Sequence, residues 1–336
     1  MKRVGNLMPR IVAMENLHEA FLRAARGKSG KAAVIDFRNH LDERLSLIQE
    51  HLSDGTFRFG QYHFFTINDP KERTICAASF PERVVFHAMM RICHPVFENY
   101  QTNDSYASRI GRGTYKALDR ARFFASRYEW FAKIDVCKYF DSINHKVLLG
   151  QLSRLFKDSM LLIYFRDLLD TYSVNDGNGL PIGNLTSQYF ANHYLSVADH
   201  YIKESVRVPA MVRYMDDVLI FSHTKTELLG WVKRYYDYLN SALLLKVHEP
   251  VINQSRFGVP FLGYVVYGKH LRLNRRSKER FETKMSKLNT ALAHDEITET
   301  EYANRATCMM AFVNKADAAG FRRLMMEKKG VYPQGL

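Results

Sequence analysis

The tetrapeptide YMDD at residues 214–217 constrains the fold more than any other feature of this chain. Short apolar runs rich in branched and aromatic residues lie on either side of its two carboxylates, MVRY at 211–214 and VLIF at 218–221. Such runs are typical of strands, and the polar Asp-Asp step predicts the tight turn of a hairpin. Adjacent carboxylates raise each other's pKa unless a cation compensates, and Mg²⁺ takes carboxylate oxygens while sharing itself with substrate phosphates. The alternative interpretation is a solvated turn.

Charge and cysteine usage narrow the class of protein. The chain has 336 residues, enough for about two domains, and a net charge of +13 with a pI near 9.5. This balance favours a polyanionic partner, nucleic acid before an anionic membrane, although a merely basic soluble protein is the alternative. Four cysteines without a CxxC pair argue against a zinc site or disulfide framework. Without a long apolar run or a secretory leader, we expect a cytoplasmic protein with no membrane partner.

A second acidic position supports the metal interpretation. Asp135 lies at the end of an apolar strand expected over residues 130–136. Two-metal catalysis needs carboxylates from separate strands that converge on ions roughly 4 Å apart. A strand-borne Asp135 and the hairpin carboxylates can meet this requirement on one sheet. In isolation, Asp135 could equally cap a turn.

Periodicity predicts strands and helices that alternate without Rossmann glycine spacing, so we expect a mixed or antiparallel sheet with helices packed on it. Further strands are predicted at 62–67, 74–77, 246–252 and 261–267, beside the 211–221 hairpin. The helices are predicted at 11–26, 34–51, from Pro81 onwards, at 114–127, 185–204, 225–244 and throughout 275–328. A loop dense in turn residues occupies 176–183.

Three motifs give the chain a resemblance to a known family. DVCKYF at 135–140, GLPIG at 179–183 and YMDD at 214–217 occur in the order and spacing of reverse transcriptases. FLGY at 261–264 follows where that family has its primer-grip segment. The resemblance covers roughly residues 55–325 and implies an α+β right-hand polymerase fold. It implies an N-terminal helical extension (1–54), fingers (55–130 and 142–190), palm (131–141 and 191–268) and a helical thumb (269–336).

A narrower resemblance points to the reverse transcriptases of diversity-generating retroelements. Residues 64–75, 105–114 and 183–188 look like that group. Ile182-Gly183 and Ser187-Gln188 replace the Gln-Gly and Ser-Pro of most bacterial reverse transcriptases. The resemblance implies an enzyme that copies a template RNA into cDNA with errors opposite adenines. A Gln at position 182 could hydrogen-bond the incoming nucleotide or nearby backbone, whereas Ile182 cannot.

The resemblance also assigns roles around the reaction centre. Two Mg²⁺ ions, with Mn²⁺ as a substitute, would be held by Asp135, Asp216 and Asp217, with the backbone carbonyl of Val136 completing the coordination. The residues implied to bind the deoxynucleoside triphosphate are Lys71, Arg73, Phe140, Ile182 and Gly183. Phe140 occupies the steric-gate position, although without the resemblance it is simply a core residue. The family lysine that would protonate the leaving pyrophosphate is missing near Val251.

Other residues are implied to hold template RNA and the cDNA primer. Tyr214 and Met215 would pack under the primer end beside Gly263 of the primer grip, with core packing as the generic alternative. Two basic stretches would follow phosphates, and their members are Arg109, Arg112 and Lys116 by the fingers and Arg276, Arg280 and Lys284 in the thumb. The alternative for these cations is a solvated surface. The resemblance also implies a small basic accessory protein as a partner.

Two other functions remain open from the sequence. One is a reverse transcriptase of the group II intron or retron type. The other is a non-catalytic RNA-binding scaffold that retained the fold. The intact residues that disfavour it are Asp135, Asp216, Asp217 and Arg73.

Overall fold

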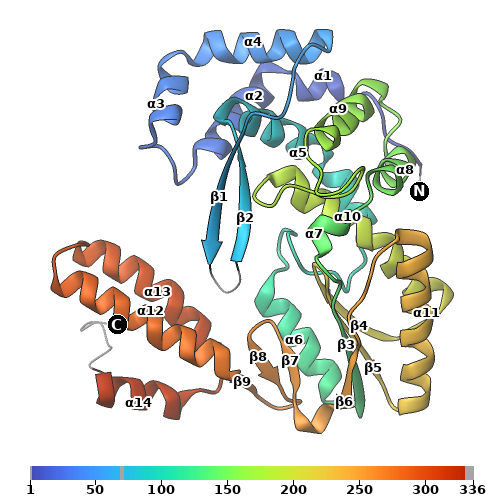
Figure 1. Ribbon diagram of the computed structural model, residues 1–336, viewed down its shortest axis with the longest axis vertical. Coiled ribbons are helices and arrows are strands. Elements are labelled where there is room, and N and C mark those ends of the chain that lie inside the picture. The colour runs from blue at the N-terminus through green and yellow to red at the C-terminus, as the bar shows by residue number, and fades with distance from the viewer. Residues whose placement is uncertain (1, 69–71, 330–336) are drawn as a thin grey trace. The chain divides into compact units, whose positions relative to one another are not determined.

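Two structural units make up the chain in the computed structural model, which describes residues 2–68 and 72–329 (Figure 1). Unit 1 comprises Met1–Arg109, Val136–Arg207 and Arg234–His248, and unit 2 comprises Ile110–Asp135, Val208–Lys233 and Glu249–Leu336. Helix α11 (Lys225–Leu243) contributes residues to both.

Unit 1 is mainly helical and carries one β-hairpin, β1 (Tyr62–Asn68) paired with β2 (Glu72–Ala78) (Figure 1). Its long helix α5 (Phe80–Tyr100) begins where the Ser79 hydroxyl accepts a hydrogen bond from the Glu82 amide. Two helices pack on the apolar face of α5, namely α2 (Met14–Ala25) and α10 (Leu185–His200). The other helices are α1 (Met8–Ile11), α3 (Ala32–Asn39), α4 (Leu41–Asp54), α7 (Tyr139–Ser142), α8 (His145–Leu155) and α9 (Ser159–Asp170).

Unit 2 is organised around a four-stranded antiparallel sheet with the strand order β4-β5-β3-β6. The strands are β3 (Trp130–Ile134), β4 (Ala210–Tyr214), β5 (Asp217–Ser222) and β6 (Val251–Gln254). The residues of β5 after Asp217 are almost fully buried, and α6 (Thr114–Ala125) packs against β4 and β5. This burial fixes the register, because a slip of one residue would turn the apolar side chains to the other face.

The rest of unit 2 is a small antiparallel sheet followed by helices (Figure 1). The sheet pairs β7 (Val259–Phe261), β8 (Tyr264–Val266) and β9 (Leu271–Leu273). Helix α12 (Arg275–Ala293) packs against α13 (Glu299–Asn314), which starts with a capping box formed by Thr298 and Glu301. The last described helix is α14 (Ala319–Lys329).

Helices with antiparallel sheets confirm the predicted α+β class. The finer boundaries of fingers, palm and thumb stay predictions. None of the helices in the described residues has the length and apolar character that a bilayer crossing requires.

Several predicted elements were wrong in extent. The single helix expected over 34–51 is two helices, α3 and α4, which meet at His40. The strand expected over 246–252 is confined to β6 from Val251, because Pro250 lacks the amide that a strand ladder uses. The stretch 185–204 ends in a π-helical turn, Tyr201–Ser205. The stretch 275–328, predicted to be helical throughout, is interrupted at 294–298 and at 315–318.

Candidate active site

The carboxylate hairpin of unit 2 differs in one detail from the prediction. Tyr214 pairs with Asp217, so the tight turn consists of Met215 and Asp216, and Asp217 is already the first residue of β5. Met215 has φ +57°, a left-handed conformation that costs a side-chain-bearing residue free energy. Non-glycine residues in this region persist only where their surroundings hold them, and such strain is typical of functional sites.

Arg213 supplies part of that support. Its side chain is fully buried, and Nη1 donates a hydrogen bond of 2.9 Å to the carbonyl of Met215. The bond links the end of strand β4 to Met215, the strained residue that precedes Asp216. A buried guanidinium is rare because its desolvation is costly, so this contact marks a constrained turn.

Asp135 reaches the same part of the sheet through β3. The last antiparallel pair of β3 and β5 is Ile134 with Val218, so the next pair in this register is Asp135 with Asp217. Directly opposite residues of an antiparallel pair share a face of the sheet. The sheet therefore brings together the three carboxylates that the sequence singled out, Asp135, Asp216 and Asp217.

The proximity of the three carboxylates affects the pKa of Asp217. Burial, together with the charges of Asp135 and Asp216, raises the pKa of Asp217 to about 6, while Lys133 opposes the rise. Nζ of Lys133 lies 3.3 Å from Oδ1 of Asp217, and the two side chains are 26% and 19% exposed. This contact is an ion pair rather than a directional hydrogen bond, because the buried Oδ1 has no hydrogen-bond partner of good geometry.

The donor set of this cluster fits a hard divalent cation. Mg²⁺ and Mn²⁺ prefer carboxylate oxygens, and Oδ1 of Asp217 is a buried acceptor that lacks a hydrogen bond. Across residues 2–68 and 72–329, however, no three acidic, histidine or cysteine side chains converge into a ready-made cage. The cluster therefore offers ligands from protein while substrate phosphates and water would have to complete the coordination.

In unit 1, the loop that contains Ile182 and Gly183 docks on β2. The amide of Cys76 donates a hydrogen bond of 2.8 Å to the carbonyl of Ile182. Gly183 has φ +121°, and a Cβ there would lie 2.9 Å from Ile75 Cγ2 and 3.0 Å from the carbonyl oxygen of Cys76. Only glycine allows this close approach, which joins the loop to the strand that carries Arg73.

A basic cavity of about 300 Å³ opens beside this loop. Its polar lining includes Lys28, Arg83 and His87, and no acidic side chain belongs to the lining among the described residues. Burial and the neighbouring cations Arg83, Arg23 and Lys28 lower the pKa of His87 to about 4. Asn184, at the N-terminus of α10, is buried, and its Nδ2 donor has no hydrogen-bond partner. The cations of its lining make the cavity electropositive, which suits an anionic ligand.

A family model described as reverse transcriptase (RNA-dependent DNA polymerase) matches residues 68–266, more than half of the chain. The chain belongs to this family.

Relatives within the reverse transcriptase family share modest identity with the chain. The group II intron-encoded protein LtrA of Lactococcus lactis subsp. cremoris is 25% identical over 201 residues, which cover 57% of this chain and 33% of LtrA. The putative COX1/OXI3 intron 1 protein of Saccharomyces cerevisiae is 22% identical over 173 residues, covering 49% of this chain and 21% of the relative. The chain therefore spans about a fifth to a third of the length of these relatives.

Solved telomerase structures show a weak likeness to this chain. The structure of apo telomerase from Candida tropicalis has a TM-score of 0.48 and 12% identity, covering 66% of this chain and 49% of the telomerase chain.

The remaining residues predicted to bind nucleotide lie in unit 1. Arg73 is exposed on β2 opposite Ile67, whereas Lys71 lies outside the described residues. Phe140 lies in α7, where its carbonyl accepts a hydrogen bond from the Leu180 amide. Val136, expected to offer a carbonyl to the metal, forms an isolated bridge with Val247.

The two group-specific residues of α10 differ in exposure. Ser187 is buried, while Gln188 is exposed and its Oε1 accepts a hydrogen bond of 3.4 Å from the Ser108 hydroxyl. Gln188 also lines the basic cavity.

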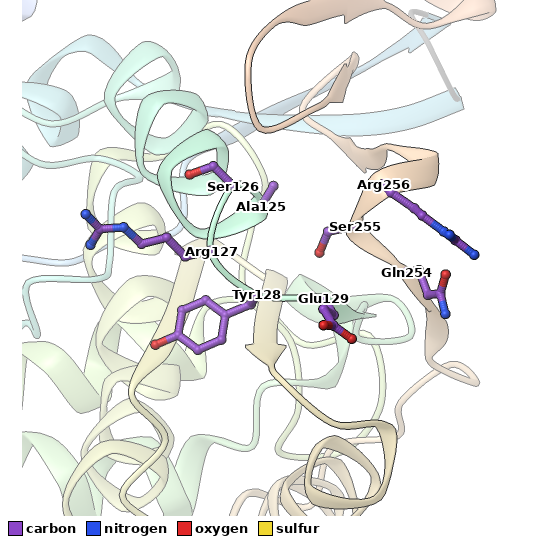
Figure 2. Close-up of a pocket in the computed structure, with 8 residues that line it drawn as sticks. All are labelled: Ala125, Ser126, Arg127, Tyr128, Glu129, Gln254, Ser255 and Arg256. Carbon is purple, nitrogen blue, oxygen red and sulfur yellow. The ribbon is translucent and has the colours of Figure 1, made fainter.

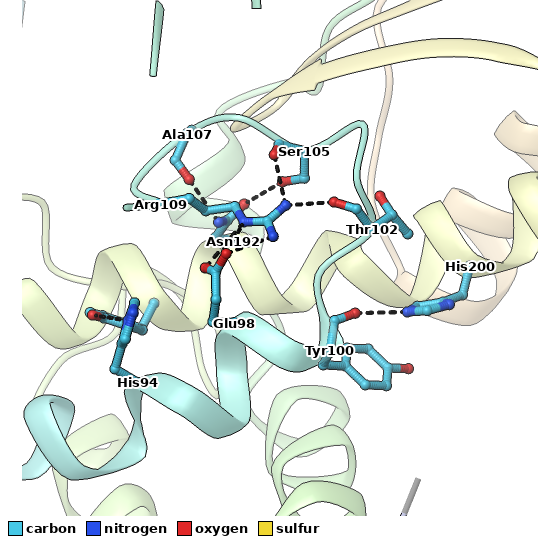
Figure 3. Close-up of polar contacts among 10 residues, drawn as sticks. His94, Glu98, Tyr100, Thr102, Ser105, Ala107, Arg109, Asn192 and His200 are labelled. Atoms are coloured by element: carbon cyan, nitrogen blue, oxygen red, sulfur yellow. Dashed lines mark hydrogen bonds and ion pairs between the residues drawn. The ribbon is translucent and has the colours of Figure 1, made fainter. Parts of the chain in front are cut away.

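Arg109 has a structural role that the sequence did not predict (Figure 3). Its side chain is only 5% exposed, and Nη2 lies 2.7 Å from a carboxylate oxygen of Glu98. Nη1 donates to the carbonyls of Thr102 and Ser105, so the guanidinium ties the end of α5 to the following loop. These contacts use the donors that a phosphate would need, and the geometry gives no support to the predicted nucleic-acid contact.

Other residues predicted to bind nucleic acid lie in unit 2. Lys116 is exposed on α6, and Arg112 is half-buried before it. The Tyr214 hydroxyl accepts a hydrogen bond of 3.1 Å from Thr114. Gly263 has φ +86°, and a Cβ there would lie 2.9 Å from the Ser277 hydroxyl. On α12, Arg276 and Lys284 are exposed and Arg280 is half-buried.

A larger cavity of unit 2, about 460 Å³, lies away from the carboxylates (Figure 2). Its lining includes Glu129, which precedes β3, whereas Asp135 follows the same strand, so the two lie at opposite ends of it. The side chains of Arg127 and Arg256 diverge rather than converge on the cavity (Figure 2). This cavity has no part in the candidate active site.

Sequence reasoning missed Lys133 and the residues of the basic cavity. Lys133 was detectable in principle, because it precedes Asp135 by two positions and therefore shares a face of β3 with it. No local signal brings Lys28, Arg83 and Asn184 together, since they come from distant parts of the chain.

Proposed function

We propose that the chain is an RNA-directed DNA polymerase that works by metal-assisted nucleotidyl transfer. The observation that carries the proposal is the register of the four-stranded sheet, which aligns Asp135 with the hairpin carboxylates in a chain of the reverse transcriptase family. Its substrates would be an RNA template, a DNA primer and deoxynucleoside triphosphates.

Asp135 and Asp216 are the proposed metal ligands, and Asp217 supports the same cluster. Two divalent cations, Mg²⁺ or Mn²⁺, would lower the pKa of the primer hydroxyl and neutralise charge on the triphosphate. The protein's contribution is to hold the carboxylates on a rigid, buried sheet. Arg213 fixes the turn that presents Asp216, through its hydrogen bond to the Met215 carbonyl.

Residues of unit 1 are proposed to bind the nucleotide and the template. Arg73, with Lys71, would clamp the triphosphate, because a guanidinium binds phosphate oxygens in a bidentate manner. Phe140 is the proposed steric gate against a ribose 2′-hydroxyl. The basic cavity around Lys28 and Arg83 is proposed to receive the template strand, which its charge supports.

The proposed subtype is a diversity-generating retroelement enzyme that makes errors opposite template adenines. Ile182 supports this subtype, because an aliphatic side chain cannot hydrogen-bond the nascent base pair as a glutamine can. Ser187 and Gln188 support it as the second departure from the common bacterial pattern. A small basic accessory protein is proposed as partner, with shared RNA bridging two chains of like charge.

A second candidate function is an intron-type reverse transcriptase. The names of LtrA and of the yeast intron 1 protein, to which the chain is similar, favour it. Sequencing of cDNA products separates the two candidates: errors concentrated opposite adenines favour the retroelement, and uniformly accurate copying favours the intron type. In the retroelement case, Ile182→Gln should lower misincorporation opposite adenine, and an unchanged error spectrum would remove Ile182 from the explanation.

Primer extension on an RNA template with Mg²⁺ tests the polymerase proposal. Asp216→Asn should abolish synthesis, because it removes a charged metal ligand. The matched control is Asp42→Asn, since Asp42 lies on α4 with a side chain 92% exposed and should be dispensable. The assay is run with and without cognate RNA and accessory protein. Synthesis by Asp216→Asn at the wild-type rate, or none by the wild type under any of these conditions, refutes the proposal.

A further inference from the structure

Lys133 lies on the same sheet face as the carboxylates. In the β3–β5 register it pairs with Leu219, while Asp135 continues the register opposite Asp217. Lys133 and Asp217 are therefore diagonal neighbours on one face, a separation that a long side chain can span. A lysine at this position has a geometric reason to reach the cluster.

The contact it makes is close and largely shielded from water. Nζ lies 3.3 Å from Oδ1 of Asp217, with side-chain exposures of 26% and 19%. Ion pairs in such surroundings are screened less than those on the surface. The ammonium charge of Lys133 also faces an oxygen, Oδ1 of Asp217, that has no hydrogen bond of good geometry.

We propose that Lys133 is an internal counter-cation of the carboxylate cluster, which occupies Asp217 and so limits the affinity of Asp135 and Asp216 for divalent cations. The inference rests on the proposed function, because it takes these carboxylates as the metal site. Asp217 acts as the partner of Lys133, and substrate phosphates meet the metals at the other two carboxylates.

Weak affinity before substrate binding has a chemical consequence. Without Lys133, the cluster would carry one more unit of net negative charge and would hold a divalent cation more firmly in the absence of substrate. With Lys133 in place, the remaining negative charge is smaller, so firm binding of the cations waits for the triphosphate oxygens, which add ligands and charge.

Mn²⁺ binding without substrate tests this inference, with free Mn²⁺ measured by electron paramagnetic resonance. Lys133→Met should bind Mn²⁺ about tenfold more tightly than the wild type, since one nearby positive charge is gone. Lys133→Arg should stay close to the wild type. In an Asp217→Asn background, Lys133→Met should have a much smaller effect on Mn²⁺ affinity, because the carboxylate that Lys133 pairs with is already absent. Asp216→Asn should weaken binding in every background.

Lys225→Met is the matched control. Lys225 also faces this sheet, with Nζ 5.6 Å from the ring centroid of Trp130 at the other end of β3, and its loss should leave Mn²⁺ affinity unchanged. Thermal unfolding monitors folding in all variants, and the Lys133→Met/Asp217→Asn pair keeps the test valid if Lys133→Met alone is unstable.

An unchanged or weaker Mn²⁺ affinity in folded Lys133→Met overturns the inference and leaves only a structural ion pair. So does equal tightening in the presence and absence of the Asp217 carboxylate. These outcomes are distinct from failure of the proposed function. If primer extension fails while Lys133→Met tightens Mn²⁺ binding, the proposed role of Lys133 is supported and the proposed polymerase activity is refuted.

Discussion

His87 illustrates at the scale of one residue how the basic cavity changes a titratable group. Burial and the nearby cations Arg83, Arg23 and Lys28 lower the pKa of His87 to about 4, so the imidazole is neutral at physiological pH. The unfolded chain has the ordinary histidine pKa near 6.5 and binds more protons between pH ~4 and ~6.5. The contribution of neutral His87 to the free energy of unfolding is therefore complete above pH ~6.5. It is lost as the pH falls towards ~4.

This sign gives a direct prediction. The free energy of unfolding of His87→Gln should fall less steeply than that of the wild type as the pH is lowered through this window. The titration midpoint of His87, followed by NMR, should rise in Arg83→Gln, because one of the charges that oppose protonation is removed. A wild-type midpoint at the ordinary histidine value would show that the cavity is not electropositive.

At the scale of elements, the β4–β5 hairpin depends on the buried Arg213. Its Nη1 holds the carbonyl of Met215, whose φ of +57° is unfavourable for a residue with a side chain. Arg213→Met should lower the free energy of unfolding by about 2–4 kcal/mol, since buried partners of the guanidinium lose their charge-assisted hydrogen bonds. Urea unfolding followed by circular dichroism measures the change.

The matched control for the hairpin is Arg207→Met. Arg207 is exposed shortly before β4, so its replacement should change stability by no more than about 0.5 kcal/mol. Arg213→Lys, which keeps the charge but not the fork, should fall between the two. Equal urea midpoints for Arg213→Met and wild type would leave Met215 without its proposed support.

The elements that the sequence predicted best are those with strong local signals. The hairpin around YMDD, the strand before Asp135 and the strand pair before α5 were predicted because apolar runs and turn residues mark them. Helix boundaries with weak signals were missed, such as the break at His40 between α3 and α4. The break between α12 and α13 did carry a local signal, the Thr298-Glu301 capping box, which the sequence reasoning overlooked.

The candidate site follows the same division. The motif spacing and residue types singled out Asp135, Asp216 and Asp217 as candidates, and the strand pairing of the sheet brings these three positions close together. The buried state of Arg109 and the pairing of Lys133 with Asp217 depend on contacts between separate segments, which periodicity does not encode. The predicted nucleic-acid contact of Arg109 rested on its place in a basic stretch, which does not reveal the internal contacts that its guanidinium makes.

At the scale of the whole molecule, the net charge of +13 is the property that most constrains partners. Excess positive charge attracts polyanions of any sequence, and phosphate contacts position a nucleic acid without specifying it. Binding that rests on such contacts weakens steeply with salt, because each neutralised phosphate releases counterions. We therefore expect affinity for single-stranded RNA of unrelated sequences to be similar and strongly salt-dependent.

Helix α12 should carry a measurable share of this salt dependence. Arg276 and Lys287 are exposed on it, at positions that share a face with Lys284. If each meets one phosphate, Arg276→Gln/Lys287→Gln should reduce the slope of log affinity against log salt by about 1.4, or ~0.7 per single-strand contact. Fluorescence anisotropy of a labelled RNA across a KCl series measures the slope.

Lys233→Gln/Arg234→Gln on α11 removes the same charge from two other exposed positions and should leave the slope unchanged. Equal losses in both double variants would mean that net charge alone, rather than a phosphate track on α12, sets RNA affinity.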